Sequence, residues 1–152
     1  MSKLIADKLF PETLPSIAKI EAIYPQRNLP EGAKVVRVAP SPTGNMHVGT
    51  LFMAMVCKRV AAQSGGVFFL RIEDTDSKRE VAGATELVVK SLNDYALQPD
   101  EGLQVDGTEK GSYGPYTQSA RREIYHAYVK DLIERDLAYP CFCTSEELEE
   151  QR

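Results

Sequence analysis

The segment from residue 35 to residue 72 restricts the fold more than any other part of the sequence. Residues 35–39 are rich in β-branched side chains and stop at Pro40, which predicts a strand that enters a turn. Residues 47–63 are apolar on nearly all sides and precede two glycines, which predicts a buried helix with a glycine stop signal. Residues 67–72 form a short apolar run that is typical of a parallel strand covered on both faces. Strand, helix and strand in this order predict a βαβ unit of an α/β fold.

Further helices are predicted beyond residue 72. Apolar residues recur at helical spacing over residues 81–95 and predict an amphipathic helix that includes Gly83. Another helix is predicted over residues 119–137, where a new structural unit begins. Its predicted inner face consists of Ile124, Tyr128, Val129, Leu132 and Ile133. Thr144 and Glu147 have the spacing of a capping box, which predicts the start of a last helix.

Residues 1–32 differ in composition from the rest of the chain. They carry equal numbers of basic and acidic side chains, and prolines at positions 11, 15, 25 and 30 interrupt any long helix. We interpret them as an N-terminal extension. The two predicted parallel strands cannot bury both faces of a sheet or pair all of its backbone groups on their own, so we expect the chain to be part of a larger domain.

Composition narrows the class of protein. The chain has 152 residues, 43% of them hydrophobic and 26% charged, which is the balance of a globular protein. No apolar run reaches the ~20 residues that a membrane span needs, and the N-terminus lacks the pattern of a secretory signal. Three cysteines do not make a disulfide framework. We therefore expect a cytoplasmic protein with no membrane partner.

The net charge of −4 argues against a whole surface that binds a polyanion such as nucleic acid. Any such contact would have to be local. The best local candidate is the basic group formed by Arg121, Arg122, His126 and Lys130. A solvated helix face is the more common explanation of such charges.

The turn after the first strand carries the sharpest chemical signal. Residues 40–49 have the sequence PSPTGNMHVG and lie between a predicted strand and a predicted helix. The first N–H groups of a helix are unpaired and carry partial positive charge, so a triphosphate can bind there. Gly44 and Gly49 allow close approach of the backbone, and His47 can donate to phosphate oxygens. A histidine at a helix start is by itself more often a cap or a surface group.

Together with Arg37, this segment resembles the first signature of class I aminoacyl-tRNA synthetases in its bacterial glutamyl form. Residues 71–76 (RIEDTD), 100–102 (DEG), 114–121 and 139–144 resemble later blocks of the same family, so the resemblance covers residues 34 to 152. Glutaminyl and archaeal-type glutamyl enzymes have Glu where Ser41 stands, which favours the bacterial glutamyl form. The chain departs from the pattern at Thr50 and over residues 94–97.

The resemblance implies a domain organisation. Residues 1–32 would be the N-terminal extension, residues 33–112 the first half of a Rossmann-like catalytic domain, and residues 113–152 the beginning of an inserted α/β domain that binds the tRNA acceptor. The Lys-Met-Ser-Lys-Ser-like motif and the anticodon-binding region of the family are missing from the chain. We therefore expect an N-terminal fragment that is inactive on its own and able to self-associate.

The resemblance also implies roles for individual residues. Arg37 would face the side-chain carboxylate of glutamate, Ser41 would assist it, and Glu73 would accept from the α-amino group, with Ala39 on the same strand face as Arg37. A structural ion pair is the alternative role for Arg37. The residues expected to bind ATP are Pro40, Thr43, Gly44, His47, Gly49 and Thr50. His47 and Thr43 are the expected catalytic residues.

The implied reaction is the ATP- and Mg²⁺-dependent activation of L-glutamate, followed by transfer of the glutamyl group to tRNA(Glu). Cys141 and Cys143 would be half of a zinc site, whose other ligands would have to lie outside this chain. Two other functions remain open: a synthetase that glutamylates queuosine in tRNA(Asp), and a non-catalytic nucleotide-binding module. A basic second motif together with a helical C-terminal domain would indicate the tRNA(Glu) enzyme, the motif alone the queuosine enzyme, and neither of them a non-catalytic module.

Overall fold

The computed structural model describes residues 2–10, 13–76 and 78–152, so Pro11, one of the prolines of the predicted N-terminal extension, lies outside the described residues. The chain divides into two compact units, Ala22–Arg122 and a smaller one made of Met1–Glu21 and Glu123–Arg152. The elements are α1 (Ser2–Leu9), α2 (Ile17–Ile23), β1 (Val35–Val38), α3 (Val48–Ser64), β2 (Val67–Leu70), α4 (Ala84–Asp94), β3 (Gly102–Leu103), β4 (Glu109–Lys110), the 3-10 turn η1 (Ser119–Arg121), α5 (Arg122–Glu134) and α6 (Ser145–Glu150). None of the described helices combines the length and the apolar character that crossing a membrane requires.

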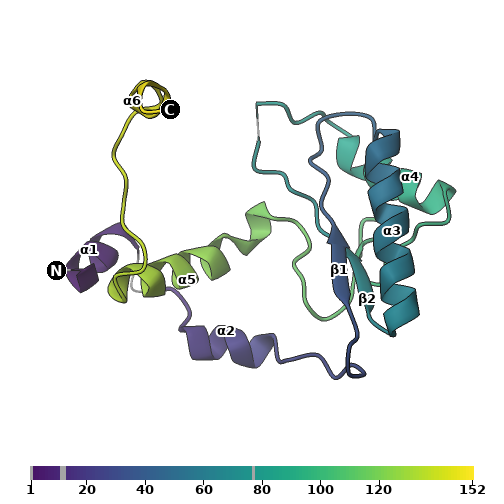
Figure 1. Cartoon of the computed structure of the whole chain (residues 1–152), viewed down its shortest axis with the longest axis horizontal. Helices are drawn as coiled ribbons and strands as arrows, with labels where there is room; N and C mark the ends of the chain where they lie inside the picture. Colours follow the sequence, from purple (N-terminus) through teal and green to yellow (C-terminus); the bar gives the residue numbers. More distant parts are fainter. Residues whose placement is uncertain (1, 11–12, 77) are drawn as a thin grey trace. The chain divides into compact units, whose positions relative to one another are not determined.

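The larger unit contains the predicted βαβ arrangement. β1 and β2 pair in parallel, with Val35 opposite Val67 and Val38 opposite Leu70. α3 connects the two strands and packs against them (Figure 1). It ends at Gly65, which adopts the left-handed conformation with φ 66° that the glycine signal predicts. The expectation of an α/β fold with a parallel strand pair is confirmed.

The hydrogen-bonded pairing continues beyond the carboxyl end of β2. On one side, the Glu73 N–H donates to the Pro40 carbonyl at 3.0 Å. On the other side, Ile72 forms a parallel bridge with Thr117: its N–H donates to the Tyr116 carbonyl at 2.9 Å, and its carbonyl accepts from the Gln118 N–H at 2.9 Å. The segment after β2 is therefore held between two neighbours. The second neighbour comes from a part of the sequence that shows no strand pattern.

The core lies between α3, α4 and one face of the sheet. Phe68, Leu70 and Ile72 alternate along β2 and its continuation and are buried, and Leu92 of α4 packs with them. Val38 is buried in the same cluster, and Val36 packs against it. These valines confirm the predicted alternation along β1, in which Arg37 lies on the opposite face.

The prediction that α3 is buried all round is wrong. Its inner stripe consists of Leu51, Ala54, Cys57 and Ala61, which face the core. The opposite side is exposed, with Phe52 58% and Met53 54% exposed. The physical reason is geometric: the strand pair covers only one side of a helix, and no described element covers the other.

Two further helices differ from their predicted form. α4 begins after Gly83, which has a left-handed φ of 79° and stands at the N-cap, so the predicted start at residue 81 is wrong. A residue with this φ cannot continue an α-helix. In α5, Ala127 and Ile133 are buried, whereas Tyr128, Val129 and Leu132 of the predicted inner face are more than a third exposed. The apolar stripe of α5 is wider than the surface that covers it in the smaller unit.

The capping box is confirmed. Thr144 accepts from the Glu147 N–H at 3.2 Å, and the Glu147 carboxylate accepts from the Thr144 N–H at 2.7 Å. These two bonds satisfy backbone donors at the start of α6. No residue of this helix is buried, so local interactions alone define it.

Candidate functional site

The loop between β1 and α3 contains most of the residues predicted to bind a nucleotide. The strand ends at Val38 and the helix begins at Val48, with His47 as N-cap. The His47 side chain is exposed and makes no capping hydrogen bond, so His47 occupies the N-cap position without capping the helix through its side chain. The loop is tied to the rest of the unit by its backbone: the Pro42 carbonyl accepts from the Val81 N–H at 2.9 Å.

The start of α3 offers unpaired donors. The N–H groups of Thr50 and Leu51 both donate to the His47 carbonyl, at 3.0 and 3.2 Å. Within the described part of the chain, no backbone N–H from Gly44 to Gly49 donates a hydrogen bond to another backbone group. Together with the partial positive charge of a helix N-terminus, these donors are suited to the oxygens of an anionic group.

A pocket of about 120 Å³ opens in this loop. It is lined by Pro40, Ser41, Thr43, Gly44, Asn45, Met46, His47, Thr50 and Val88. Ligand sites usually reach about 300 Å³ or more, so this pocket can hold a phosphate-sized part of a ligand rather than a whole nucleotide. Gly49 does not line the pocket, but a Cβ at Gly49 would meet no protein atom within 4 Å.

Three charged side chains meet beside this loop. Arg37 donates from Nη1 to Glu73 Oε1 at 2.8 Å, and Arg71 donates from Nη2 to the same oxygen at 2.9 Å. The loop and this cluster are adjacent because the Glu73 backbone is bonded to Pro40. Alternation explains the arrangement: Arg71 and Glu73 lie two residues apart on one side of the extended chain.

The electrostatics of the cluster follow from its composition. Burial raises the pKa of Glu73, but the hydrogen bonds from Arg71 and Arg37 outweigh burial and hold the pKa below its usual range. Two guanidinium groups around one carboxylate leave one positive charge in excess. Arg37 is 41% exposed and can therefore be reached by a second carboxylate. The alternative role of Arg37 was a structural ion pair, and its ion pair with Glu73 is present as well.

Sequence reasoning placed Glu73 on the same strand face as Arg71, because two residues spaced two apart in an extended chain share one side. It gave Arg71 no role in the site, and the structure adds Arg71 to the cluster through its hydrogen bond to Glu73. The remaining predicted residues lie near the cluster. Ala39 follows Arg37 by two residues and is half-buried. The Ser41 carbonyl accepts a hydrogen bond from the Thr43 N–H at 2.9 Å.

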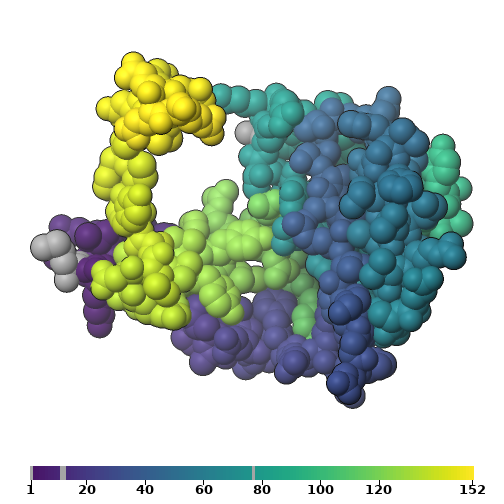
Figure 2. Space-filling model, in the orientation of Figure 1, coloured from purple at the N-terminus to yellow at the C-terminus, as the bar shows by residue number. Residues whose placement is uncertain are grey.

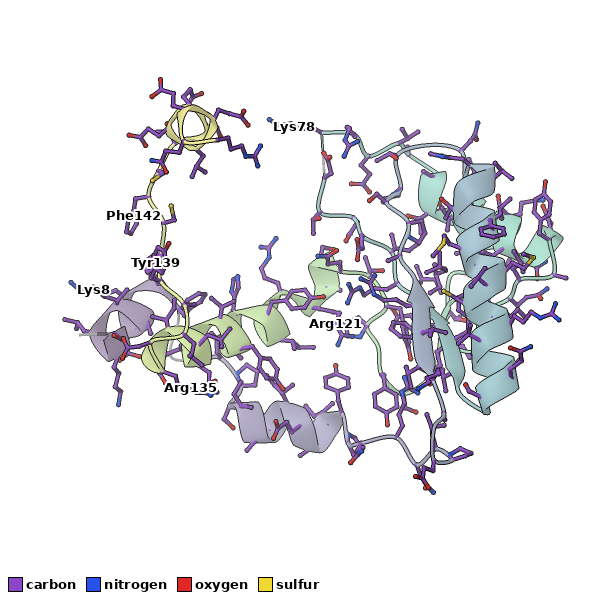
Figure 3. The ribbon with its side chains drawn as sticks, viewed as in Figure 1. Lys8, Lys78, Arg121, Arg135, Tyr139 and Phe142 are labelled. Carbon is purple, nitrogen blue, oxygen red and sulfur yellow. The ribbon has the colours of Figure 1, made fainter. Side chains whose placement is uncertain are left out.

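The predicted half zinc site lies in the smaller unit. Cys141 and Cys143 are exposed on the extended segment after α5 that also carries Tyr139 and Phe142 (Figure 3). Hydrogen bonds from Cys143 lower the pKa of the Cys141 thiol. Among the described residues, no three His, Cys, Asp or Glu side chains are close enough to hold a metal ion.

The predicted basic group is not supported as a free surface. Arg121, labelled in Figure 3, donates from Nη1 to the Tyr113 and Pro115 carbonyls, both at 2.9 Å. Lys130 pairs with Asp7 at 2.8 Å. The His126 ring packs edge-on against Phe10 with centroids 5.3 Å apart. These contacts engage three of the four side chains within their own units.

Residues 34–152 match the family described as tRNA synthetases class I (E and Q), catalytic domain. The glutamate–tRNA ligase of Clostridium perfringens (strain 13 / Type A) is 56% identical over 129 residues, which cover 85% of this chain and 24% of that protein. The glutamate–tRNA ligase of Acetivibrio thermocellus is 54% identical over 151 residues, which cover 99% of this chain and 28% of that protein.

Two solved structures are similar in fold and sequence. A glutamate tRNA ligase from Elizabethkingia meningosepticum, crystallised in complex with its amino acid, superposes with a TM-score of 0.66 at 42% identity, covering 78% of this chain and 23% of that chain. A glutamate-tRNA synthetase from Elizabethkingia anophelis superposes with a TM-score of 0.68 at 42% identity, covering 79% and 23%. The chain thus spans about a quarter of the length of these relatives.

Proposed function

The chain belongs to the class I tRNA synthetases for glutamate and glutamine, and we propose that it forms the first part of the nucleotide and glutamate site of a glutamate–tRNA ligase. The catalytic-domain fold of the family, with parallel strands and helices, agrees with this role. The reaction would activate L-glutamate with ATP and transfer it to tRNA(Glu) in the cytoplasm. Residues 33–112 would be the first half of the Rossmann-like domain with its His-Val-Gly-Thr motif, and residues 113–152 the beginning of the inserted acceptor-binding domain.

One observation carries the proposal: Arg37 and Arg71 converge on Glu73 beside the loop that starts α3. An acidic amino acid needs a cation for its side-chain carboxylate and an anion for its ammonium group. Arg37 can supply the first through a charge-assisted hydrogen bond, and Glu73 can supply the second. On binding, glutamate would exchange the Arg37–Glu73 ion pair for two pairs with the substrate, while Arg71 keeps Glu73 oriented.

The loop residues would bind the phosphates of ATP. The unpaired N–H groups from Gly44 to Gly49 match phosphate oxygens, and His47 and Thr43 line the same pocket as further donors. Stabilising charge on the departing pyrophosphate is the role that we assign to His47. Mg²⁺ would be bound together with ATP, because this ion prefers oxygen ligands such as those of phosphates. Bound MgATP would supply the adenylyl group.

The test is kinetic and uses the protein that carries this chain. Glutamate-dependent exchange between ATP and pyrophosphate should be measured for wild type and Arg37→Ala. The variant loses a charge-assisted contact worth about 1.5–3 kcal/mol, so the KM for glutamate should rise about 10- to 100-fold while the KM for ATP stays nearly unchanged. Arg152→Ala, which removes an arginine from an exposed pair with Glu149, is the matched control.

Charging of tRNA(Glu) and tRNA(Asp) in the same preparation identifies the acceptor. Charging of tRNA(Asp) alone would point to the queuosine-modifying enzyme, and absence of exchange in wild type would point to a non-catalytic module. Equal losses for glutamate and ATP in Arg37→Ala would assign Arg37 a structural role instead.

A further inference from the structure

The end of the N-terminal extension lies against the turn at residues 113–116 within the larger unit. The Tyr24 hydroxyl donates to the Gly114 carbonyl at 2.7 Å, and the Tyr113 hydroxyl donates to the Pro25 carbonyl at 2.8 Å. The Arg27 guanidinium stacks 3.7 Å from the centre of the Tyr113 ring. These reciprocal contacts attach the extension to one specific turn.

Arg27 also forms an enclosed ion pair with Glu101. Its two terminal nitrogens donate to the two carboxylate oxygens of Glu101 at 2.5 and 2.6 Å. The side chains of Arg27 and Glu101 are only 18% and 13% exposed. A bidentate pair at this burial fixes the orientation of the carboxylate as well as its charge.

Glu101 and Tyr116 are also hydrogen-bonded to the extended segment that leads from β2 to Glu73. The Tyr116 hydroxyl donates to Glu101 at 2.8 Å, and Tyr116 is only 2% exposed. The Tyr116 carbonyl accepts from the Ile72 N–H, and the Glu101 carbonyl accepts from the Leu70 N–H, both at 2.9 Å. Glu101 and Tyr116 are therefore both hydrogen-bonded to the segment that directly precedes Glu73.

The network is densely packed, and its environment shifts the pKa of both Tyr116 and Glu101. A Cβ at Gly111 would lie 2.3 Å from the Tyr116 hydroxyl oxygen, so a larger residue there would force Tyr116 or Glu101 to move. Burial and the bond to Glu101 raise the pKa of Tyr116 to about 12, so its hydroxyl stays a donor at neutral pH. The hydrogen bond from Arg27 and, less strongly, the one from Tyr116 hold the pKa of Glu101 below its usual range, despite burial.

We propose that Arg27 is a positioning residue for the glutamate site: from the N-terminal extension it orients Glu101 and Tyr116, and through them the backbone that presents Glu73. The inference rests on the proposed function of Glu73. Arg27 precedes residues 34–152, the part of the chain that the family model covers. Without Arg27, the carboxylate of Glu101 would be enclosed without its cation, which favours rearrangement of the network.

The first test is structural and independent of activity. Amide hydrogen exchange of the 152-residue chain should be compared for wild type, Arg27→Ala and Arg27→Lys. We expect faster exchange at the Ile72 and Gln118 N–H groups in Arg27→Ala, with a smaller effect in Arg27→Lys, which keeps the charge but not the two-pronged geometry. The Leu51 N–H in α3 is the internal control and should not change.

The second test measures glutamate-dependent ATP–pyrophosphate exchange in the protein that carries this chain. Misplacing Glu73 should raise the KM for glutamate about tenfold in Arg27→Ala, with partial rescue in Arg27→Lys and less than about a twofold change in the KM for ATP. Arg135→Ala, which breaks an exposed pair with Asp131 at 3.1 Å, is the matched control.

The outcomes separate the two proposals. A wild-type protein without glutamate-dependent exchange of pyrophosphate would overturn the proposed function, while amide exchange would still report on the network. An active wild type with an unchanged glutamate KM in Arg27→Ala would overturn the positioning role. So would equal rises in both KM values, because general loss of structure would then explain them.

Discussion

Gly49 is a single residue at which protein stability and ligand binding can be separated. A Cβ there would meet no protein atom within 4 Å, and alanine is favoured over glycine inside a helix by about 1 kcal/mol. Gly49→Ala should therefore leave the melting temperature unchanged or raise it. If phosphates approach the start of α3, the added methyl group should raise the KM for ATP several-fold.

Gly66→Ala provides the contrast. A Cβ at Gly66 would lie 1.9 Å from the Lys34 carbonyl oxygen, so the start of β1 would have to move. Such overpacking costs about 1–3 kcal/mol and should lower the melting temperature. Thermal melts and ATP titrations of both variants check the pair. An unchanged ATP KM in Gly49→Ala would count against the phosphate role of the helix start.

Among the secondary-structure elements, α6 depends on its capping box. Thr144→Ala removes the acceptor for the Glu147 N–H and should cost about 1 kcal/mol of helix stability. Because α6 buries no residue, the loss should stay local: helix content falls and the Glu147 amide exchanges faster, while the melting transition of the chain does not move.

Circular dichroism and amide exchange measure this effect. Ser145→Ala is the control, since Ser145 lies in the first turn without a capping bond and alanine is a good helix former. A lower melting temperature in Thr144→Ala would show that α6 packs on other elements in solution.

For the molecule as a whole, the outer side of α3 is an exposed apolar surface of the larger unit. Phe52, Met53, Met55, Val56 and Val60 are all exposed there. Figure 2 shows α3, in dark blue to teal, as part of the visible surface of this unit. Exposed apolar patches of this kind mark interaction surfaces. We therefore expect the 152-residue chain to self-associate as its concentration rises.

Analytical ultracentrifugation over a concentration series tests the association. Combining Phe52→Ser with Met53→Ser removes apolar area without touching the inner stripe of α3, so it should weaken association while the fold is retained. Leu4→Ser, an equally exposed residue of α1, is the matched control. A strictly monomeric wild-type chain would contradict the prediction.

The elements that could be predicted from the sequence are those that depend on local interactions. β-branched residues, the Gly65 stop signal and the spacing of Thr144 and Glu147 act within a few residues, so β1, α3 and the capping box were predictable. Side-chain alternation likewise placed Arg37 away from the core. The loop residues of the candidate site were predicted from the same strand–turn–helix pattern and from a family resemblance.

Tertiary packing alone determines which apolar faces are covered and which charges meet. The burial of α3 depends on how many elements pack around it. The sequence of the helix alone does not show that number. Arg37 and Glu73 lie 36 residues apart, and Arg27 and Glu101 lie 74 apart. These side chains are brought together by the parallel register of β1 and β2 and by the hydrogen bonds that join residues 24 and 25 to the turn at residues 113–116. Such contacts depend on the geometry of the whole unit, which no local spacing in the sequence encodes.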